Sequence, residues 1–302
     1  MNLYTERHGL RKPIARTSKI SKEVYTLLLN ICQKYYKNLT HIFKLQQHCS
    51  FVDQYYIEFD RSQFENRMAI KIPNILRDEY GHIAAPQYND DDYDQYSLID
   101  LIEYVAENIK DISEGWNNDR YKNYWYTHCL DTTKALDDYR NEINEIFQES
   151  GLLFTLTSGK LIERIVENTP LSPAIETQVQ QIAEYGTREL MKDAIALYKT
   201  PNPAARQDSV EKIWDALERL KTYYTNLDKR GSATKVVNDM SNGKDEFITI
   251  FDAEFKALTD IGNNFRIRHH ETNKIDITDN RHYDYFFNRC LSLIALAIQY
   301  LK

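Results

Sequence analysis

Glycine and proline are scarce in this sequence, with 9 and 7 copies in 302 residues. Both residues interrupt regular structure, so their scarcity favours long, uninterrupted helices. Between the few breaks, apolar residues recur at spacings of three and four, the period of one helix face. The sequence therefore predicts a mostly α-helical protein.

Long apolar runs are also missing. No stretch of about 18 apolar residues exists, so we expect no membrane-spanning helix. The segment from Met1 to His8 has no apolar core of a secretory signal. The four cysteines are scattered, with no CxxC pair and no zinc spacing, which is typical of buried thiols in a reducing compartment. We predict a cytoplasmic protein with no membrane partner, no metal and no cofactor.

Basic charge is not in excess. Lysine and arginine total 38 against 45 acidic residues, which gives a net charge of −7. A broad surface for nucleic acid needs clustered basic side chains that neutralise phosphates. The net charge argues against such a surface but leaves room for a small, locally basic site.

Helical spacing marks most of the chain. In the first half we expect four helices, over 20–46, 64–75, 97–112 and 132–149. Ser21 and Ser97 are the expected N-caps of the first and third, and Pro73 breaks the second. In the second half we expect four helices, over 175–197, 210–224, 247–261 and 283–301. A glycine at 229–231 stops the second of these, and Gly262 stops the third.

One segment breaks this pattern. Residues 152–162 contain two short apolar runs around a Thr-Ser-Gly turn, which predicts a β-hairpin. Two prolines follow within 166–173 and mark a hinge or linker. We therefore expect two domains, an N-terminal mostly helical domain over 1–168 and a C-terminal helical bundle over 173–302.

Two further clusters have structural interpretations. The acidic loop 89–94 lacks the glycine and glutamate of a calcium-binding loop, so we interpret it as solvated. The aromatic stretch 116–126 could stack nucleic-acid bases, but such residues more often pack a core, and we favour the core.

Residues 263–271 hold two arginines, two histidines and a carboxylate, just before the last helix. Arginine keeps its charge and can bind a phosphate, while histidine titrates near neutrality and can move a proton. These are the groups needed to cut RNA without a metal. The alternative is a solvated helix end with one histidine in a local hydrogen bond, since a motif match is only a hypothesis without its context.

Residues 209–220 and 263–271, in a helical bundle, resemble the HEPN superfamily, and more closely the C-terminal module of bacterial abortive-infection proteins of the AbiJ kind. The first half, up to the hairpin, is similar to what precedes that module in such proteins. The resemblance implies a metal-independent ribonuclease that works as a dimer, with both motifs meeting in one cleft. Some members of the superfamily are inert and serve as binding or scaffold modules.

The sequence departs from the HEPN motif at its arginine. Only three residues separate Arg266 from His270, and the position of the motif arginine holds Asn264 or Asn263. Either Arg268 or Arg266 supplies the cation by another geometry, or the site is degenerate.

We assign the proton transfer to His270, as base or acid, and the phosphate contact to Arg268, with Arg266 as the alternative cation. Three neighbours have supporting roles. Asn264 orients the phosphate or the imidazole, Glu271 holds the histidine tautomer, and His269 is structural or catalytic. A metal site made of His269, His270 and Glu271 is disfavoured, because adjacent histidines on a helix point apart.

Two functions are therefore expected. The first is antiphage defence of the abortive-infection type, with RNA as substrate of an Arg/His site at a homodimer cleft. The second is an inert bundle that dimerises and binds a nucleotide or partner, with the N-terminal domain as sensor. A phage or antitoxin protein is the expected trigger. The last helix supports a dimer, since Leu291, Leu293, Ile294 and Leu296 cannot share one narrow face.

Overall fold

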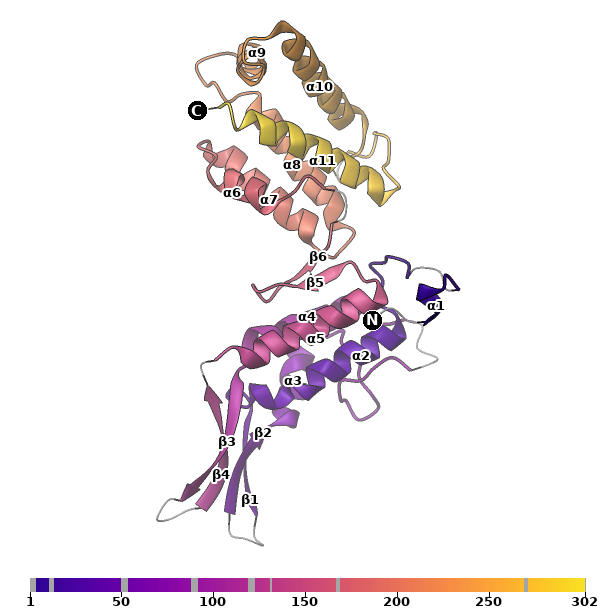
Figure 1. Cartoon of the computed structure of the whole chain (residues 1–302), viewed down its shortest axis with the longest axis vertical. Coiled ribbons are helices and arrows are strands. Elements are labelled where there is room, and N and C mark those ends of the chain that lie inside the picture. The colour runs from indigo at the N-terminus through magenta and orange to yellow at the C-terminus, as the bar shows by residue number, and fades with distance from the viewer. Residues whose placement is uncertain are drawn as a thin grey trace. The chain divides into compact units, whose positions relative to one another are not determined.

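The computed structural model describes residues 4–10, 14–49, 54–87, 92–118, 123–130, 132–166, 169–268 and 271–301. The chain is mostly α-helical, as predicted (Figure 1). It divides into two compact units, residues 1–163 and 164–302, and each unit has a hydrophobic core of its own.

Three helices form the core of the N-terminal unit, packed against one another: α2, α4 and α5. The helices of this unit are α1 (Tyr4–Arg7), α2 (Lys22–Lys34), α3 (Arg61–Lys71), α4 (Gln95–Asn108) and α5 (Lys134–Ser150), with a 3-10 turn at Tyr36–Leu39. Helix α3 ends before Pro73 and Ser21 caps α2, both as predicted. Helix α4 is capped by Asp94 rather than by Ser97, whose hydroxyl instead donates to the Asp94 carboxylate at 2.8 Å.

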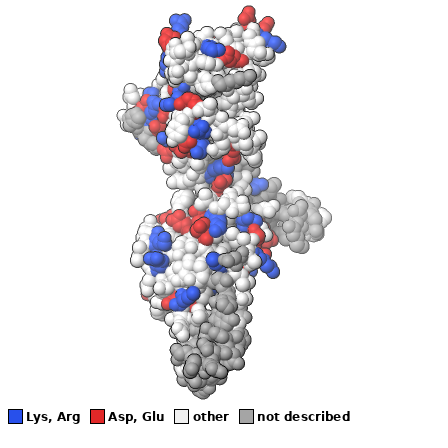
Figure 2. All heavy atoms as spheres, turned by 90° about the vertical axis from the view of Figure 1, so that its left-hand side faces the viewer, with Lys and Arg blue, Asp and Glu red and all other residues white. Residues whose placement is uncertain are grey.

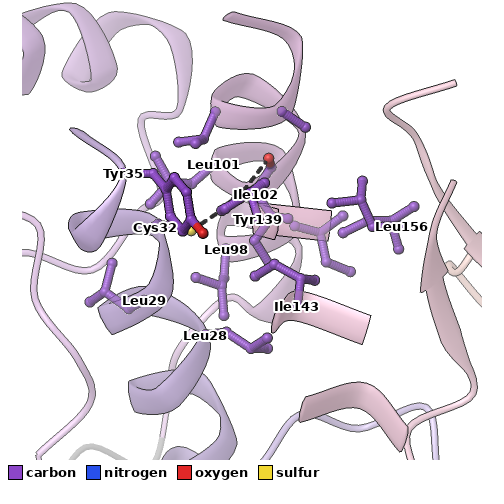
Figure 3. Packing of buried hydrophobic residues seen from close by; sticks show 14 of the residues in the cluster. Leu28, Leu29, Cys32, Tyr35, Leu98, Leu101, Ile102, Tyr139, Ile143 and Leu156 are labelled. Carbon is purple, nitrogen blue, oxygen red and sulfur yellow. Dashed lines mark hydrogen bonds between the residues drawn. The ribbon is translucent and has the colours of Figure 1, made fainter. Parts of the chain in front are cut away.

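Tyr139 lies fully buried at the centre of this core (Figure 3). Its hydroxyl donates to the Ile102 carbonyl at 3.1 Å and lies 3.3 Å from the Cys32 sulfur. Burial raises the pKa of Cys32 to about 12, and that of Cys290 in the other unit also to about 12. Both thiols are protonated and buried, as expected for these two cysteines. The side chains of the other two lie outside the described residues.

A four-stranded sheet was not predicted. Its strands β1 (Lys44–Cys49), β2 (Gln54–Phe59), β3 (Asp111–Asn118) and β4 (Asn123–Leu130) lie in the order β1-β2-β4-β3. The central pair is parallel and the outer pairs are antiparallel. One helix over 20–46 is therefore wrong beyond Lys34, because the chain turns at Tyr35 and residues 44–49 pair with β2.

Two interpretations fall at least partly outside the described residues. The described backbone of the aromatic stretch, residues 116–118 and 123–126, belongs to β3 and β4, but all of its side chains are outside the description. Of the acidic loop, only residues 92–94 are described, and Asp94 serves as a helix cap.

The predicted β-hairpin is confirmed. Strands β5 (Phe154–Leu156) and β6 (Ile162–Arg164) form a two-stranded sheet around the expected turn. In that turn Lys160, not Gly159, adopts the left-handed conformation, with φ of 66°.

Helix α8 is the central element of the C-terminal unit, where it packs on α7 and α11. The helices of this unit are α6 (Pro173–Gln180), α7 (Tyr185–Lys199), α8 (Ala205–Leu220), α9 (Lys229–Met240), α10 (Asp245–Asn264) and α11 (Asn280–Ala297). Residues 175–197 are thus two helices rather than one. Residues 229–231 begin α9 instead of ending a helix, because the Asp228 carboxylate accepts the Gly231 N–H at 2.7 Å as an N-cap.

The apolar residues of α11 that were expected to support a dimer are covered within the chain. Leu291, Leu293 and Ile294 are buried within their own chain, and Leu296 is half-buried. Helix α11 has apolar residues on several sides because other parts of the C-terminal unit pack against it on several sides. Over the part of the chain that the structure describes, no helix is long and apolar enough to cross a membrane.

Candidate functional site

The segment after α10 folds back on itself in a short, bridged loop. Phe265 pairs with Ile275 as an isolated parallel bridge, and the Arg266 N–H donates to the Ile275 carbonyl at 2.8 Å. The Ile275 N–H in turn donates to the Asn264 carbonyl at 3.0 Å. Ile267 is fully buried between the two arginines and anchors the segment in the core. The bridge and this anchor fix the backbone of Arg266 and Arg268.

Arg268 contacts a carboxylate, an aromatic ring and a second carboxylate nearby. Its guanidinium donates to Asp215 at 2.5 Å and lies over the Trp214 ring, 4.7 Å from the ring centroid. A second nitrogen lies 3.7 Å from the Glu271 carboxylate. The side chain remains 26% exposed, so the cation is held in place yet accessible to a ligand. Contact with an aromatic face and a carboxylate orients a planar guanidinium strongly.

Trp214 is the platform of this cluster. Its indole N–H donates to the Leu258 carbonyl of α10 at 3.2 Å. Gly262 allows the close approach, since a Cβ there would lie 2.0 Å from the indole ring. This explains why Gly262 lies inside α10 rather than at its end, where the sequence pattern had placed it. The glycine serves packing, and the helix continues to Asn264.

Glu271 joins the cluster from the far side of the loop. Its carboxylate lies 2.9 Å from the Lys274 ammonium, which also donates to the Gly262 carbonyl at 3.1 Å. The predicted role of Glu271, to hold a histidine tautomer, concerns His269 and His270, which lie outside the described residues. The described ion pairs of Glu271 are with Arg268 and Lys274.

Arg266 and Asn264 have partners away from Arg268. Arg266 lies 3.1 Å from the Asp276 carboxylate and is about one-third exposed. The exposed Asn264 amide donates to the Asp260 carbonyl one turn earlier, at 2.8 Å. The structure therefore brings Arg268 and Glu271 together and leaves Arg266 and Asn264 with separate partners.

Among the described residues, three carboxylates act on the charge of Arg268, those of Asp215, Glu271 and Glu211. Burial lowers the pKa of Arg268, but the hydrogen bond and charge of Asp215, with the charges of Glu271 and Glu211, outweigh it and raise this pKa above its ordinary value. The guanidinium is therefore permanently charged. A phosphate that approached this guanidinium would compete with the Asp215 carboxylate.

The described residues contain no group of three or more His, Cys, Asp or Glu side chains arranged for a metal. Both histidines of the disfavoured site of His269, His270 and Glu271 lie outside the description. The absence of a metal site thus remains a prediction for this segment.

Trp214 and Asp215 were not identified as site residues from the sequence. Helical spacing placed Trp214 in the core face of its helix, where it is nearly buried. Asp215 follows it directly, on a helix whose other charged residues are mostly half-buried as well. An aspartate beside a core tryptophan was the available signal, but its arginine partner lies 53 residues later.

Comparison with known proteins assigns the N-terminal part. Residues 2–181 match the family model described as AbiJ N-terminal domain 4. The match covers the whole N-terminal unit and α6 of the next, and leaves the 263–271 segment outside. No curated protein and no solved structure matches the chain. Since the family model spans more than half of the 302 residues, the chain belongs to the AbiJ N-terminal domain 4 family and is an AbiJ-like abortive-infection protein.

Proposed function

We propose that this chain is an abortive-infection defence protein whose C-terminal bundle is HEPN-like and cuts RNA through Arg268 and His270 without a metal. One observation carries the proposal. The Arg268 guanidinium is fixed over Trp214, partly open to solvent, and directly precedes the two histidines in the chain. The family assignment of residues 2–181 supports the defence role.

The chemistry follows from the residue types. His270 takes the proton of the RNA 2′-hydroxyl, or returns one to the leaving oxygen, since an imidazole titrates near neutral pH. Arg268 binds the phosphate and stabilises its growing negative charge in place of Asp215. A second copy of the chain would supply the other proton-transfer group. Acid–base catalysis of this kind contributes roughly 10²–10⁴-fold in rate.

The pairing with Asp215 does not silence Arg268 in this proposal. An ion pair near the surface contributes only about 0–1 kcal/mol, so a phosphate can replace the carboxylate. The N-terminal unit senses a phage or antitoxin protein and raises an activity that the bundle already has. Acidic and basic residues intermix on the face drawn in Figure 2, so the described charges there form no broad basic surface for RNA.

The second candidate is an inert HEPN-like bundle that dimerises and binds a partner. Two observations favour it. Arg268 and Arg266 both contact carboxylates, Asp215 and Asp276. Asn264 or Asn263 also stands where the motif arginine is expected, and an amide carries no charge.

Phage infection of cells that carry the protein tests both. We expect Arg268→Ala and His270→Ala to remove protection and the accompanying RNA breakage, while the control Arg230→Ala, on the exposed side of α9, keeps both. Protection that survives in both variants, with intact RNA, would favour the inert bundle. If Arg230→Ala also loses protection, the loss of any basic side chain abolishes protection, and the effect of Arg268→Ala is not specific.

A further inference from the structure

A hollow lies at one end of the C-terminal bundle, where the α6–α7 connection meets the ends of α8 and α11. It has a volume of about 450 Å³, within the roughly 300–1,000 Å³ range of small-molecule sites. Its apolar wall includes Leu220 and Ile298, the last residue of α8 and the residue that caps α11.

The polar lining of this hollow consists of uncharged groups. Gln178, Gln181 and Gln299 contribute three amides, and Tyr223 contributes an aromatic ring with a hydroxyl. Among the described residues that line it, none carries a charge. A charged ligand group would lose its hydration here without a counter-ion, so the site suits a neutral ligand.

One of these amides is incompletely satisfied. The Gln178 side-chain oxygen is buried and has no hydrogen-bond partner in the described part of the chain. A buried acceptor left without a donor destabilises the fold, and most such atoms in proteins are paired. A ligand that donates a hydrogen bond in this hollow would satisfy it.

We propose that this hollow binds a nucleobase. Glutamine amides donate and accept side by side, which matches the paired donors and acceptors on base edges. An aromatic side chain and apolar walls suit the flat faces of a base. The sugar, and any phosphate, would extend through the open side into solvent. The base can belong to a free nucleoside or to single-stranded RNA.

This site is separate from the Arg268 cluster and does not depend on the proposed function. No residue lines the hollow and also belongs to that cluster. Leu220 follows Asp215 by five positions on α8, about 7.5 Å along its axis and about 140° around it. An inert bundle would retain the base site.

Calorimetric titration of the full chain with adenosine, guanosine, cytidine and uridine tests this inference. We expect at least one nucleoside to bind, and Gln178→Leu to weaken that binding about tenfold, because the apolar side chain cannot hydrogen-bond the base. Gln180→Leu is the matched control, because Gln180 is exposed on the same helix and does not line the hollow. Ala183→Leu, at an exposed position on the rim, should block binding if Gln178→Leu fails to fold.

A second arm identifies the source of the base. A tetranucleotide of the preferred base that binds more tightly than its nucleoside points to RNA, and equal affinity points to a free nucleoside. Three results would overturn the inference: no nucleoside binds at millimolar concentration, Gln178→Leu binds as well as Gln180→Leu, or acetamide competes as well as the best nucleoside.

Discussion

Arg268 owes its orientation to neighbours that are distant in sequence. Trp214 and Asp215 precede it by more than 50 positions, and both lie on α8. The ring supports the planar guanidinium and the carboxylate fixes its rotation. Lysine keeps the charge but has neither the plane nor the fork of donors.

Arg268→Lys should therefore rescue poorly. If the bundle cuts RNA, we expect the lysine variant to resemble Arg268→Ala, with a loss of about 10²–10³-fold in rate, typical of one lost transition-state donor. Single-turnover cleavage measures this loss. Activity near wild type would mean that charge alone is sufficient and that the contact with Trp214 is incidental.

Gly262→Ala should destabilise the C-terminal unit. Alanine favours helix over glycine by about 1 kcal/mol, but its Cβ would overlap the indole of Trp214. Overpacking of this kind typically costs about 1–3 kcal/mol. Urea denaturation measures the change, with Gly159→Ala as control, because the nearest atom there is 3.5 Å from an added Cβ. Equal stability of the two variants would contradict the close packing.

At the scale of elements, helical spacing predicted most helices, but not every end. Ser21 and the break before Pro73 were local signals, and both hold. The sheet escaped prediction because β1 reads Lys-Leu-Gln-Gln-His-Cys, without a regular apolar alternation. Its central pair joins residues 54–56 to residues 123–125, and short patterns do not reveal so distant a pairing.

The site was predictable to a smaller extent. Local composition singled out residues 263–271, and Arg268 and Glu271 do lie together. The pairing with Asp215 depends on how α8 and the returning loop pack, which periodicity does not encode.

Helix α7 begins at a titratable cap. Glu184 accepts the N–H groups of Gly186 and Thr187 at 3.0 and 2.6 Å, and Arg219 of α8 donates to both of its oxygens at 2.8 and 2.9 Å. The hydrogen bonds from Arg219 hold the pKa of Glu184 well below its ordinary value of 4.5. Burial opposes this effect, and the hydrogen bonds from Thr187 and Gly186 add to it. The cap therefore requires the ionised carboxylate.

This cap predicts acid sensitivity of the C-terminal unit. A carboxyl whose pKa is lower in the folded protein than in the unfolded chain stabilises the fold. This contribution is complete at a pH above the ordinary pKa, and it is lost as the pH falls toward the lowered pKa. Glu184→Gln should lower stability at neutral pH and flatten the decline below about pH 5. Thermal melts across this range measure it, with the exposed Asp252→Asn of α10 as control. A decline as steep as that of the wild type would count against the cap.

At the scale of the molecule, the chain consists of two units with separate cores, and one family model accounts for the first. The proposed homodimer uses the C-terminal unit. Helix α11 no longer supports it, since its apolar residues are covered by their own chain. Helix α10 instead exposes Phe247 and Ile250, at 46% and 56%.

Ile250→Asp should dissociate the proposed dimer, because a charge in an apolar contact loses its hydration. Sedimentation at micromolar concentration measures the assembly. Thr249→Asp is the control, since it adds the same charge at the adjacent exposed position. A wild-type monomer would reject the dimer, and a dimer that persists in Ile250→Asp would reject this surface.

The most direct test of the central claim is cleavage of tRNA by the purified full chain in EDTA. Wild type should cut the RNA without metal, and His270→Ala and Arg268→Ala, with melting temperatures near that of wild type, should not. Intact RNA with wild type, with or without added Mg²⁺, would contradict the account and leave the inert bundle as the better description. So would full cleavage by a folded His270→Ala.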